Sequence, residues 1–194
     1  MSIPPADSLD RRRLFPLAVV QAAEAKPSEV QCEVVRLFDE LRTPTLRYVL
    51  SFGLSVHDGE EIVQEVFLAL LRHLRLGRRR DNLRGWVFRV AHNLALKRRQ
   101  ASHRSPEGTE ADWESAQRRP DPSSNPEQEL SQKQRHSRLL AVFCSLPEED
   151  RCCLRLRAEG LRYREIAAVL GKSLGSVSNS LTRSLERMSR ADEW

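Results

Sequence analysis

Two stretches of the sequence place polar side chains at helical spacing. In the first, Asp58, Glu61, Gln64 and Glu65 recur at steps of three and four residues, which puts them on one side of a helix. Glu60, Glu61 and Glu65 in this stretch could mimic the paired carboxylates of an acid–base catalyst, but a solvated or partner-binding helix surface is the simpler interpretation. The five histidines are scattered along the chain. The sequence therefore indicates no catalytic site, and we predict that the protein is not an enzyme.

The second stretch combines amide and basic side chains. Arg89, Asn93 and Lys97 stand at i, i+4 and i+8, beside an apolar face rather than within it. They belong to a cationic block, because the segment from Arg72 to Arg104 holds eleven Lys and Arg residues and a single acid. In a chain of net charge +5 and pI near 9.4, this block predicts a polyanionic partner, with nucleic acid the leading candidate. The alternative is a solvated cationic surface.

A third stretch, residues 161–185, has the pattern of a helix-turn-helix. Ile166 and Leu170 would face a core, and Gly171 would supply the tight turn. Val177 and Leu181 would pack the second helix against the first. This packing leaves five side chains to face a DNA groove, where such groups can read base edges: Ser176, Ser178, Asn179, Thr182 and Arg183. The alternative is a plain helical hairpin used only for packing.

Composition argues against several other classes of protein. No apolar run approaches the roughly 20 residues that cross a bilayer, so we expect no membrane insertion. Cys32, Cys144, Cys152 and Cys153 form no Cys-x-x-Cys pair, which argues against zinc and favours buried thiols in a reducing cytosol. We therefore expect a cytoplasmic protein without a metal or another cofactor.

The hydrophobic pattern predicts an all-α fold. Apolar residues recur at helical spacing in both halves of the chain, and a Pro- and Ser-rich stretch separates the halves. Four helices are expected within 29–103. A break at Thr43-Pro44 is predicted to separate the first two helices, because proline disfavours α geometry in the residue before it. A turn over 55–59 is predicted to lead into the last two. We predict two small helical domains, 29–103 and 130–191, joined by a flexible linker, 104–129, and preceded by a disordered extension, 1–28.

Taken together, these stretches resemble RNA polymerase sigma factors of the sigma-70 superfamily, in the small extracytoplasmic-function (ECF) group. The resemblance is carried by three segments: Asp58–Phe67, Leu83–Ala95 and Leu146–Arg187. They occur in the family's order, with its usual linker, and the match covers about 29–103 and 130–190. Several matching segments in the right order are much stronger evidence than any one of them alone.

The resemblance implies partners for each stretch. The helix with Asp58, Glu61, Gln64 and Glu65 resembles the segment that docks on the clamp helices of the polymerase β′ subunit, and the β flap of the core enzyme is a further implied partner. The next helix resembles the part that melts and holds the −10 promoter element. Its implied DNA-binding residues are Asn82, Trp86, Arg89, Asn93, Lys97, Arg98 and Arg99.

Within that set, Asn93 stands where the family places a base-contacting asparagine, and Trp86 is either a core anchor or a DNA contact. The helix-turn-helix would read the −35 element. Here the chain departs from the family, because Ser178 and Ser180 occupy positions that often carry Lys or Arg. This departure predicts weaker −35 binding or an unusual −35 sequence. The family also implies restraint by a separate anti-sigma factor.

Two other functions stay open on the sequence alone. The first is a stand-alone helix-turn-helix transcription regulator, which would need no surface for a polymerase clamp. The second is an all-α adaptor that binds protein alone, which would need no basic block between Arg72 and Arg99. Binding to core polymerase separates the first from a sigma factor, and salt-dependent DNA affinity separates the second.

Overall fold

The computed structural model describes residues 28–102 and 126–192, and every regular element in these two ranges is a helix. This confirms the all-α prediction. The predicted N-terminal extension before Ser28 and the predicted linker up to residue 125 lie outside the described residues. The helices are α1 (Glu29–Leu50), α2 (Val56–Arg75), α3 (Leu83–Ser102), α4 (Pro126–Ser145), α5 (Glu148–Ala158), α6 (Tyr163–Leu170) and α7 (Leu174–Asp192).

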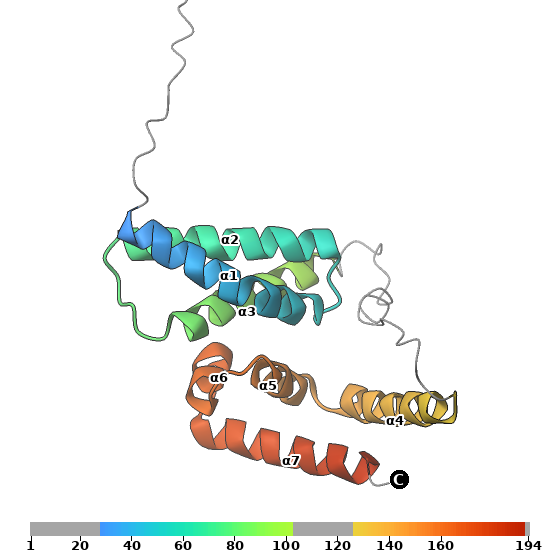
Figure 1. The fold of residues 1–194 in the computed structure, drawn as a ribbon. Coiled ribbons are helices and arrows are strands. Elements are labelled where there is room, and N and C mark those ends of the chain that lie inside the picture. The colour runs from blue at the N-terminus through green and yellow to red at the C-terminus, as the bar shows by residue number, and fades with distance from the viewer. Residues whose placement is uncertain (1–27, 103–125, 193–194) are drawn as a thin grey trace, which may run out of the picture.

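The first three helices pack on one another, and α7 packs against α4, α5 and α6. In Figure 1, α5 and α6 lie between α3 and α7. Helix α4 begins at Pro126, four residues before the predicted start of the second domain. The chain therefore forms two groups of helices, α1–α3 and α4–α7.

Only three helices, rather than four, occupy residues 29–102. Helix α1 continues through Pro44, so the predicted break at Thr43-Pro44 is wrong. The reason is burial on both sides of the proline. Leu37 and Leu41 before it, and Tyr48 and Val49 after it, lie on one buried face that packs on α2 and α3. This packing outweighs the loss of one backbone hydrogen bond at Pro44.

We expect Pro44→Ala to stabilise the protein. Alanine restores a backbone N–H in the middle of α1 and removes the ring clash with the preceding turn, although it also gives the unfolded chain more freedom. The expected net gain is about 1–2 kcal/mol in the free energy of unfolding, measured by urea denaturation. Thr43→Ala, at the exposed neighbouring position, is the control and should give a smaller gain. Equal or lower stability of Pro44→Ala would contradict this account of α1.

Helix α2 begins earlier than the sequence indicated. Ser55 is its N-cap, and the Ser55 hydroxyl oxygen accepts a hydrogen bond from the Asp58 backbone N–H at 3.1 Å. The predicted turn over 55–59 is therefore wrong, since these residues form the cap and first turn of α2. Gly59 is buried there, and a Cβ at this position would lie 2.9 Å from Leu50 and 3.0 Å from Leu46. The lack of a side chain lets α1 and α2 cross closely.

The two groups of helices also contact each other, which the sequence did not indicate. Helix α3 packs against α6, and buried apolar residues of both groups form one continuous cluster. Arg47 donates two hydrogen bonds to the Glu159 carboxylate, at 2.8 and 2.6 Å. Arg84 donates to the backbone carbonyl of Glu159 at 2.6 Å. The carboxylate and the backbone carbonyl of Glu159, at the end of α5, thus accept hydrogen bonds from arginines of α1 and α3.

Candidate functional site

The first candidate surface is the set Asp58, Glu61, Gln64 and Glu65 on α2, called here the acidic rim. Ile62, Val63 and Val66 are buried on the opposite side of the helix, which turns the rim outward. Glu61, Gln64 and Glu65 are exposed and Asp58 is half-buried. Gln64 and Glu65 make no hydrogen bond or ion pair with any residue that the structure describes. Two of the four side chains are therefore available to a partner.

The second candidate surface is the set Arg89, Asn93 and Lys97 on α3, called here the α3 stripe. Val87, Ala91 and Ala95 are fully buried on the other side of the helix. All three stripe residues are exposed, and none is paired with another described residue. A guanidinium, an amide and an ammonium group thus stand one helical turn apart, and groups of these kinds can bind phosphates and base edges.

The other predicted −10 residues are placed differently. Asn82 has a φ of +54°, and its amide oxygen accepts a hydrogen bond from the Gly85 backbone N–H at 3.0 Å, so it caps α3. Trp86 is half-buried against the core, with its ring centroid 4.8 Å from that of His73. Arg98 and Arg99 are both half-buried and engaged in ion pairs.

Ion pairs inside the protein neutralise much of the cationic block. Arg79 pairs with Asp81 at 2.7 Å, Arg80 with Glu33 at 3.0 Å and Arg84 with Glu40 at 3.6 Å. Arg99 pairs with Glu148 of α5 and lies over the Phe52 ring. Arg104 lies outside the described residues. The charge that a polyanion can meet is therefore smaller than the sequence count. Among the described residues, the cations of the block that are exposed and have no ion pair are Arg72, Arg75, Arg78, Arg89 and Lys97.

His92 lies on α3 between the stripe residues but contributes no charge to them. Its Nδ1 atom is 2.8 Å from the Tyr48 hydroxyl, and it packs near the Phe52 ring. Burial lowers the pKa of His92 below its ordinary value. The imidazole is therefore neutral at pH 7 and acts as a packing group.

Helices α6 and α7 form the predicted helix-turn-helix. Gly171 ends α6 with a φ of +64°, a conformation that favours glycine. The Ser173 hydroxyl oxygen accepts a hydrogen bond from the Ser176 backbone N–H at 3.1 Å at the start of α7. Ile166, Val177 and Leu181 are buried. The outward side of α7 carries Ser176, Asn179, Thr182 and Arg183, all exposed, and Ser178, half-buried.

Ser180 is not on that outward side. It is buried, with 6% of its surface exposed, and donates a hydrogen bond to Asp150 of α5 at 2.6 Å. The interpretation of Ser180 as a missing basic DNA contact is therefore wrong, because a residue at this position faces α5. Only Ser178 remains as an outward position where the family often carries a basic residue. Arg183 lies 3.7 Å from the same Asp150 carboxylate.

Ser180→Ala should destabilise the helix-turn-helix. The change removes the hydroxyl donor from a buried carboxylate, and leaving a buried acceptor without its partner costs about 1–3 kcal/mol in the free energy of unfolding. Ser178→Ala is the matched control on the same helix and should change stability by less than about 0.5 kcal/mol. Chemical denaturation of both variants checks the prediction, and equal stabilities would overturn it.

The structure also shows a hollow, several of whose lining residues the sequence analysis did not single out. A hollow of about 960 Å³ lies beside Asn82 at the N-terminal ends of α6 and α7, and its lining includes Arg162, Tyr163 and Arg164. Arg162 and Arg164 flank the start of α6. Two arginines at the start of a predicted helix were the sequence feature that could have pointed to this hollow.

Among the described residues, no cluster of metal-ligating side chains occurs. No helix in the described ranges is long and apolar enough to cross a membrane.

Comparison with known proteins gives two family matches. The sigma-70 region 2 family matches residues 37–105, and the sigma-70 region 4 family matches residues 136–188. The ECF RNA polymerase sigma factor SigE of Mycolicibacterium smegmatis is 34% identical over 146 residues, which is 73% of this chain and 55% of that protein. The chain thus spans about half the length of this relative. The ECF RNA polymerase sigma-E factor of Escherichia coli K12 is 30% identical over 159 residues, which is 79% of this chain and 81% of that protein.

Two solved structures share the fold. CnrH, in complex with the cytosolic domain of CnrY, superposes with a TM-score of 0.53 at 21% identity, over 82% of this chain and 87% of that chain. The sigma factor RpoE of Bartonella quintana, in complex with the anti-sigma factor NepR, gives a TM-score of 0.55 at 18% identity, over 80% and 96%. At these identities the likeness concerns the fold alone.

Proposed function

The chain belongs to the ECF group of RNA polymerase sigma factors, and from this membership we propose how its surfaces divide the work of promoter recognition. The protein directs core polymerase to promoters and performs no chemistry itself. The acidic rim of α2 binds the clamp helices of the β′ subunit, the α3 stripe holds the −10 element, and α7 reads the −35 element. The observation that carries the proposal is the α3 stripe, which is exposed, makes no hydrogen bond or ion pair with a described residue, and lies on a helix that packs against α2.

The α3 stripe suits an opened DNA strand. Arg89 and Lys97 can bind backbone phosphates on either side of Asn93, whose amide can pair with the edge of an unstacked base. Extruding a base costs a few kcal/mol, which contacts to the unpaired strand can offset. Trp86, half-buried one turn before Arg89, contributes mainly by anchoring α3 to the core. Arg99 can join the phosphate contacts only after it leaves Glu148.

Helix α7 suits the major groove of a closed duplex. Ser176, Asn179 and Thr182 present small polar groups that can read base edges, and Arg183 can bind a phosphate or a guanine. With Ser178 in place of a basic residue, fewer charged contacts hold the −35 element. We therefore expect −35 binding to be weaker and less salt-dependent than the −10 contacts.

The contact between the two groups of helices has a consequence for promoter binding. The −10 and −35 elements are about 25 base pairs apart, which is about 85 Å at 3.4 Å per base pair. Helices α3 and α6 pack directly against each other, so in this arrangement the two DNA-reading helices cannot reach both elements of a straight duplex. Engagement of both elements therefore requires α1–α3 and α4–α7 to separate, with the loss of the Arg47–Glu159 pair. The β flap of core polymerase is the proposed partner of α4–α7 in that separated state.

Two further parts of the proposal concern regulation and location. The RpoE structure contains an anti-sigma factor, and we infer that a comparable protein restrains this chain by binding its polymerase- or DNA-facing surfaces. Because the proposed partner enzyme transcribes chromosomal DNA, we also propose that the protein acts in the cytoplasm.

Co-elution with bacterial core RNA polymerase in gel filtration tests the proposed function. A stable complex of one chain per core enzyme is the expected result. If the protein does not co-elute with core but binds DNA in a separate assay, the stand-alone regulator is favoured. If it binds no DNA even at low salt concentration, the protein adaptor is favoured. Unlabelled E. coli sigma factor added in excess should displace the chain, because both would occupy one clamp site.

A further inference from the structure

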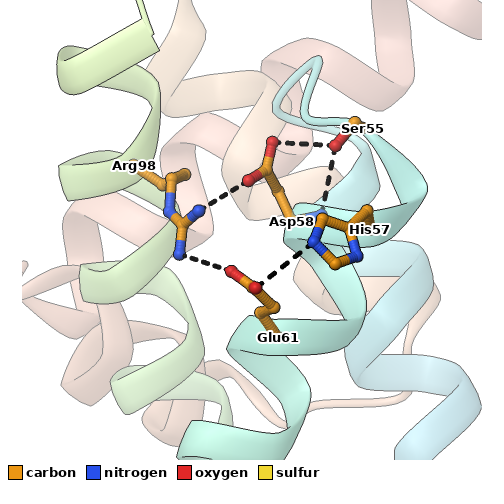
Figure 2. Close-up of polar contacts among 5 residues, drawn as sticks. All are labelled: Ser55, His57, Asp58, Glu61 and Arg98. Atoms are coloured by element: carbon orange, nitrogen blue, oxygen red, sulfur yellow. Dashed lines mark hydrogen bonds and ion pairs between the residues drawn. The ribbon is translucent and has the colours of Figure 1, made fainter.

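Arg98 connects the two candidate surfaces of the α1–α3 group. It lies near the C-terminal end of α3, and Figure 2 shows its guanidinium facing two carboxylates of α2. Its Nη1 atom donates to Asp58 Oδ1 at 2.6 Å, and its Nη2 atom donates to Glu61 Oε2 at 3.0 Å. Both acceptors belong to the acidic rim. One residue of the DNA-reading helix thus binds half of the rim proposed to meet polymerase.

Each of the two carboxylates is also held from its other side (Figure 2). Asp58 Oδ2 accepts a hydrogen bond from the Ser55 hydroxyl at 2.8 Å, while Ser55 itself caps α2. Glu61 Oε1 lies 3.3 Å from His57 Nε2. Each acid therefore has one oxygen directed at Arg98 and one directed at a residue of its own helix turn. This arrangement fixes the orientation of both side chains.

We propose that Arg98 is a positioning residue that holds Asp58 and Glu61 in the orientation used for core polymerase, and that it is not a ligand of promoter phosphate. The inference rests on the proposed function of the acidic rim and departs from the DNA-binding role that the family resemblance implied for Arg98. The planar fork of arginine matches this task, because its two terminal nitrogens can serve two carboxylates one turn apart.

The neighbouring residue Lys97 makes the contrast. Lys97 is exposed and pairs with no described residue. The Arg98 side chain is only 38% exposed, and both of its terminal nitrogens donate hydrogen bonds to carboxylates of α2. A phosphate would have to displace two carboxylates from Arg98 but none from Lys97. Preordered side chains also bind with a smaller entropy loss, since each immobilised long side chain costs affinity. Arg98 therefore contributes to polymerase affinity through the two acids.

Two measurements on Arg98→Ala distinguish positioning from phosphate binding. Affinity for core polymerase, measured at fixed salt by fluorescence anisotropy, should fall about tenfold as two acids lose their fixed orientation. The slope of log affinity against log salt, measured for holoenzyme on promoter DNA with core in saturating excess, should stay unchanged. The matched control Lys97→Ala should leave core affinity unchanged and reduce the magnitude of that slope by about 0.7–0.9, as expected for one phosphate contact.

A double-mutant cycle identifies the groups through which Arg98 acts. In the Asp58→Asn, Glu61→Gln background, Arg98→Ala should have no further effect on core affinity, because the acids that it positions are already neutral. Arg98→Lys should restore less than half of the lost affinity on a logarithmic scale, because one ammonium cannot serve both acids in the same way. A purely structural role would lower the melting temperature without producing this pattern.

Two results would overturn the inference. One is a salt slope reduced by about 0.7–0.9 in Arg98→Ala with unchanged core affinity, which would make Arg98 a phosphate ligand. The other is an equal loss of core affinity in both backgrounds of the cycle, which would mean that Arg98 contacts polymerase itself. Failure of the unsubstituted protein to bind core would instead reject the proposed function, so the two failures are distinguishable.

Discussion

Glu65→Lys is expected to abolish binding to core RNA polymerase while leaving the fold intact. Glu65 is exposed in the middle of α2 and pairs with no residue in the described parts of the chain. Reversing its charge would place a cation against a partner surface that is proposed to bind an anion at this position. Like-charge contacts across an interface cost several kcal/mol. We expect the dissociation constant to rise at least about 100-fold, measured by anisotropy with labelled protein.

The fold should tolerate this change because the Glu65 side chain makes no hydrogen bond or ion pair with any described residue. The melting temperature is expected to shift by less than about 2 °C. Asp39→Lys is the matched control, since Asp39 is an exposed acid on α1 and its replacement changes the net charge equally. A Glu65→Lys variant that binds core as tightly as the Asp39→Lys variant would remove Glu65 from the polymerase interface.

Asn93→Ala is expected to impair promoter opening and to spare core binding. Asn93 is the central residue of the α3 stripe, and its amide is the group there best suited to pair with a base edge. Loss of a good base contact costs about 1–3 kcal/mol, so open-complex formation should fall about 5- to 150-fold. Permanganate reactivity of unpaired thymines near the −10 element, measured on holoenzyme, reports the effect.

Gln100→Ala provides the control for this prediction. Gln100 is an exposed amide on the same helix, two turns beyond Asn93 and outside the predicted set of DNA contacts. Its replacement should leave opening unchanged. Because Asn93→Ala holoenzyme is expected to form normally, a defect in co-elution with core would point to α3 packing instead. Unchanged opening by Asn93→Ala would sink the base-contact assignment.

Local sequence patterns predicted the parts of this protein that depend on local periodicity. The 3.6-residue repeat located α2, α3, α6 and α7, since each helix buries one apolar stripe. The same repeat identified Arg89, Asn93 and Lys97 as a shared exposed face. It also left Glu65 outward, because Ile62 and Val66 occupy the buried side of α2.

The errors arose where contacts between distant residues decide the outcome. Pro44 is a local signal for a break, but burial of Leu41 and Tyr48 on either side keeps α1 continuous. Ser180 was misplaced for another reason, because its spacing from Val177 and Leu181 puts it on the buried stripe of α7, where it donates a hydrogen bond to Asp150. Arg98 and Arg99 read as free cations in the sequence, yet acids of α2 and α5 pair with them. Helical periodicity contains no information about such partners.

Transcription in vitro tests the central claim most directly. Core RNA polymerase would be supplied with this protein and a library of random DNA templates, and transcript 5′ ends would be mapped. The account predicts start sites that are absent without the protein, that share one sequence element near −10 and a weaker one near −35, and that disappear with Glu65→Lys. No protein-dependent start sites, although the protein binds DNA, would contradict the assignment of a promoter-directing sigma factor and favour a stand-alone regulator.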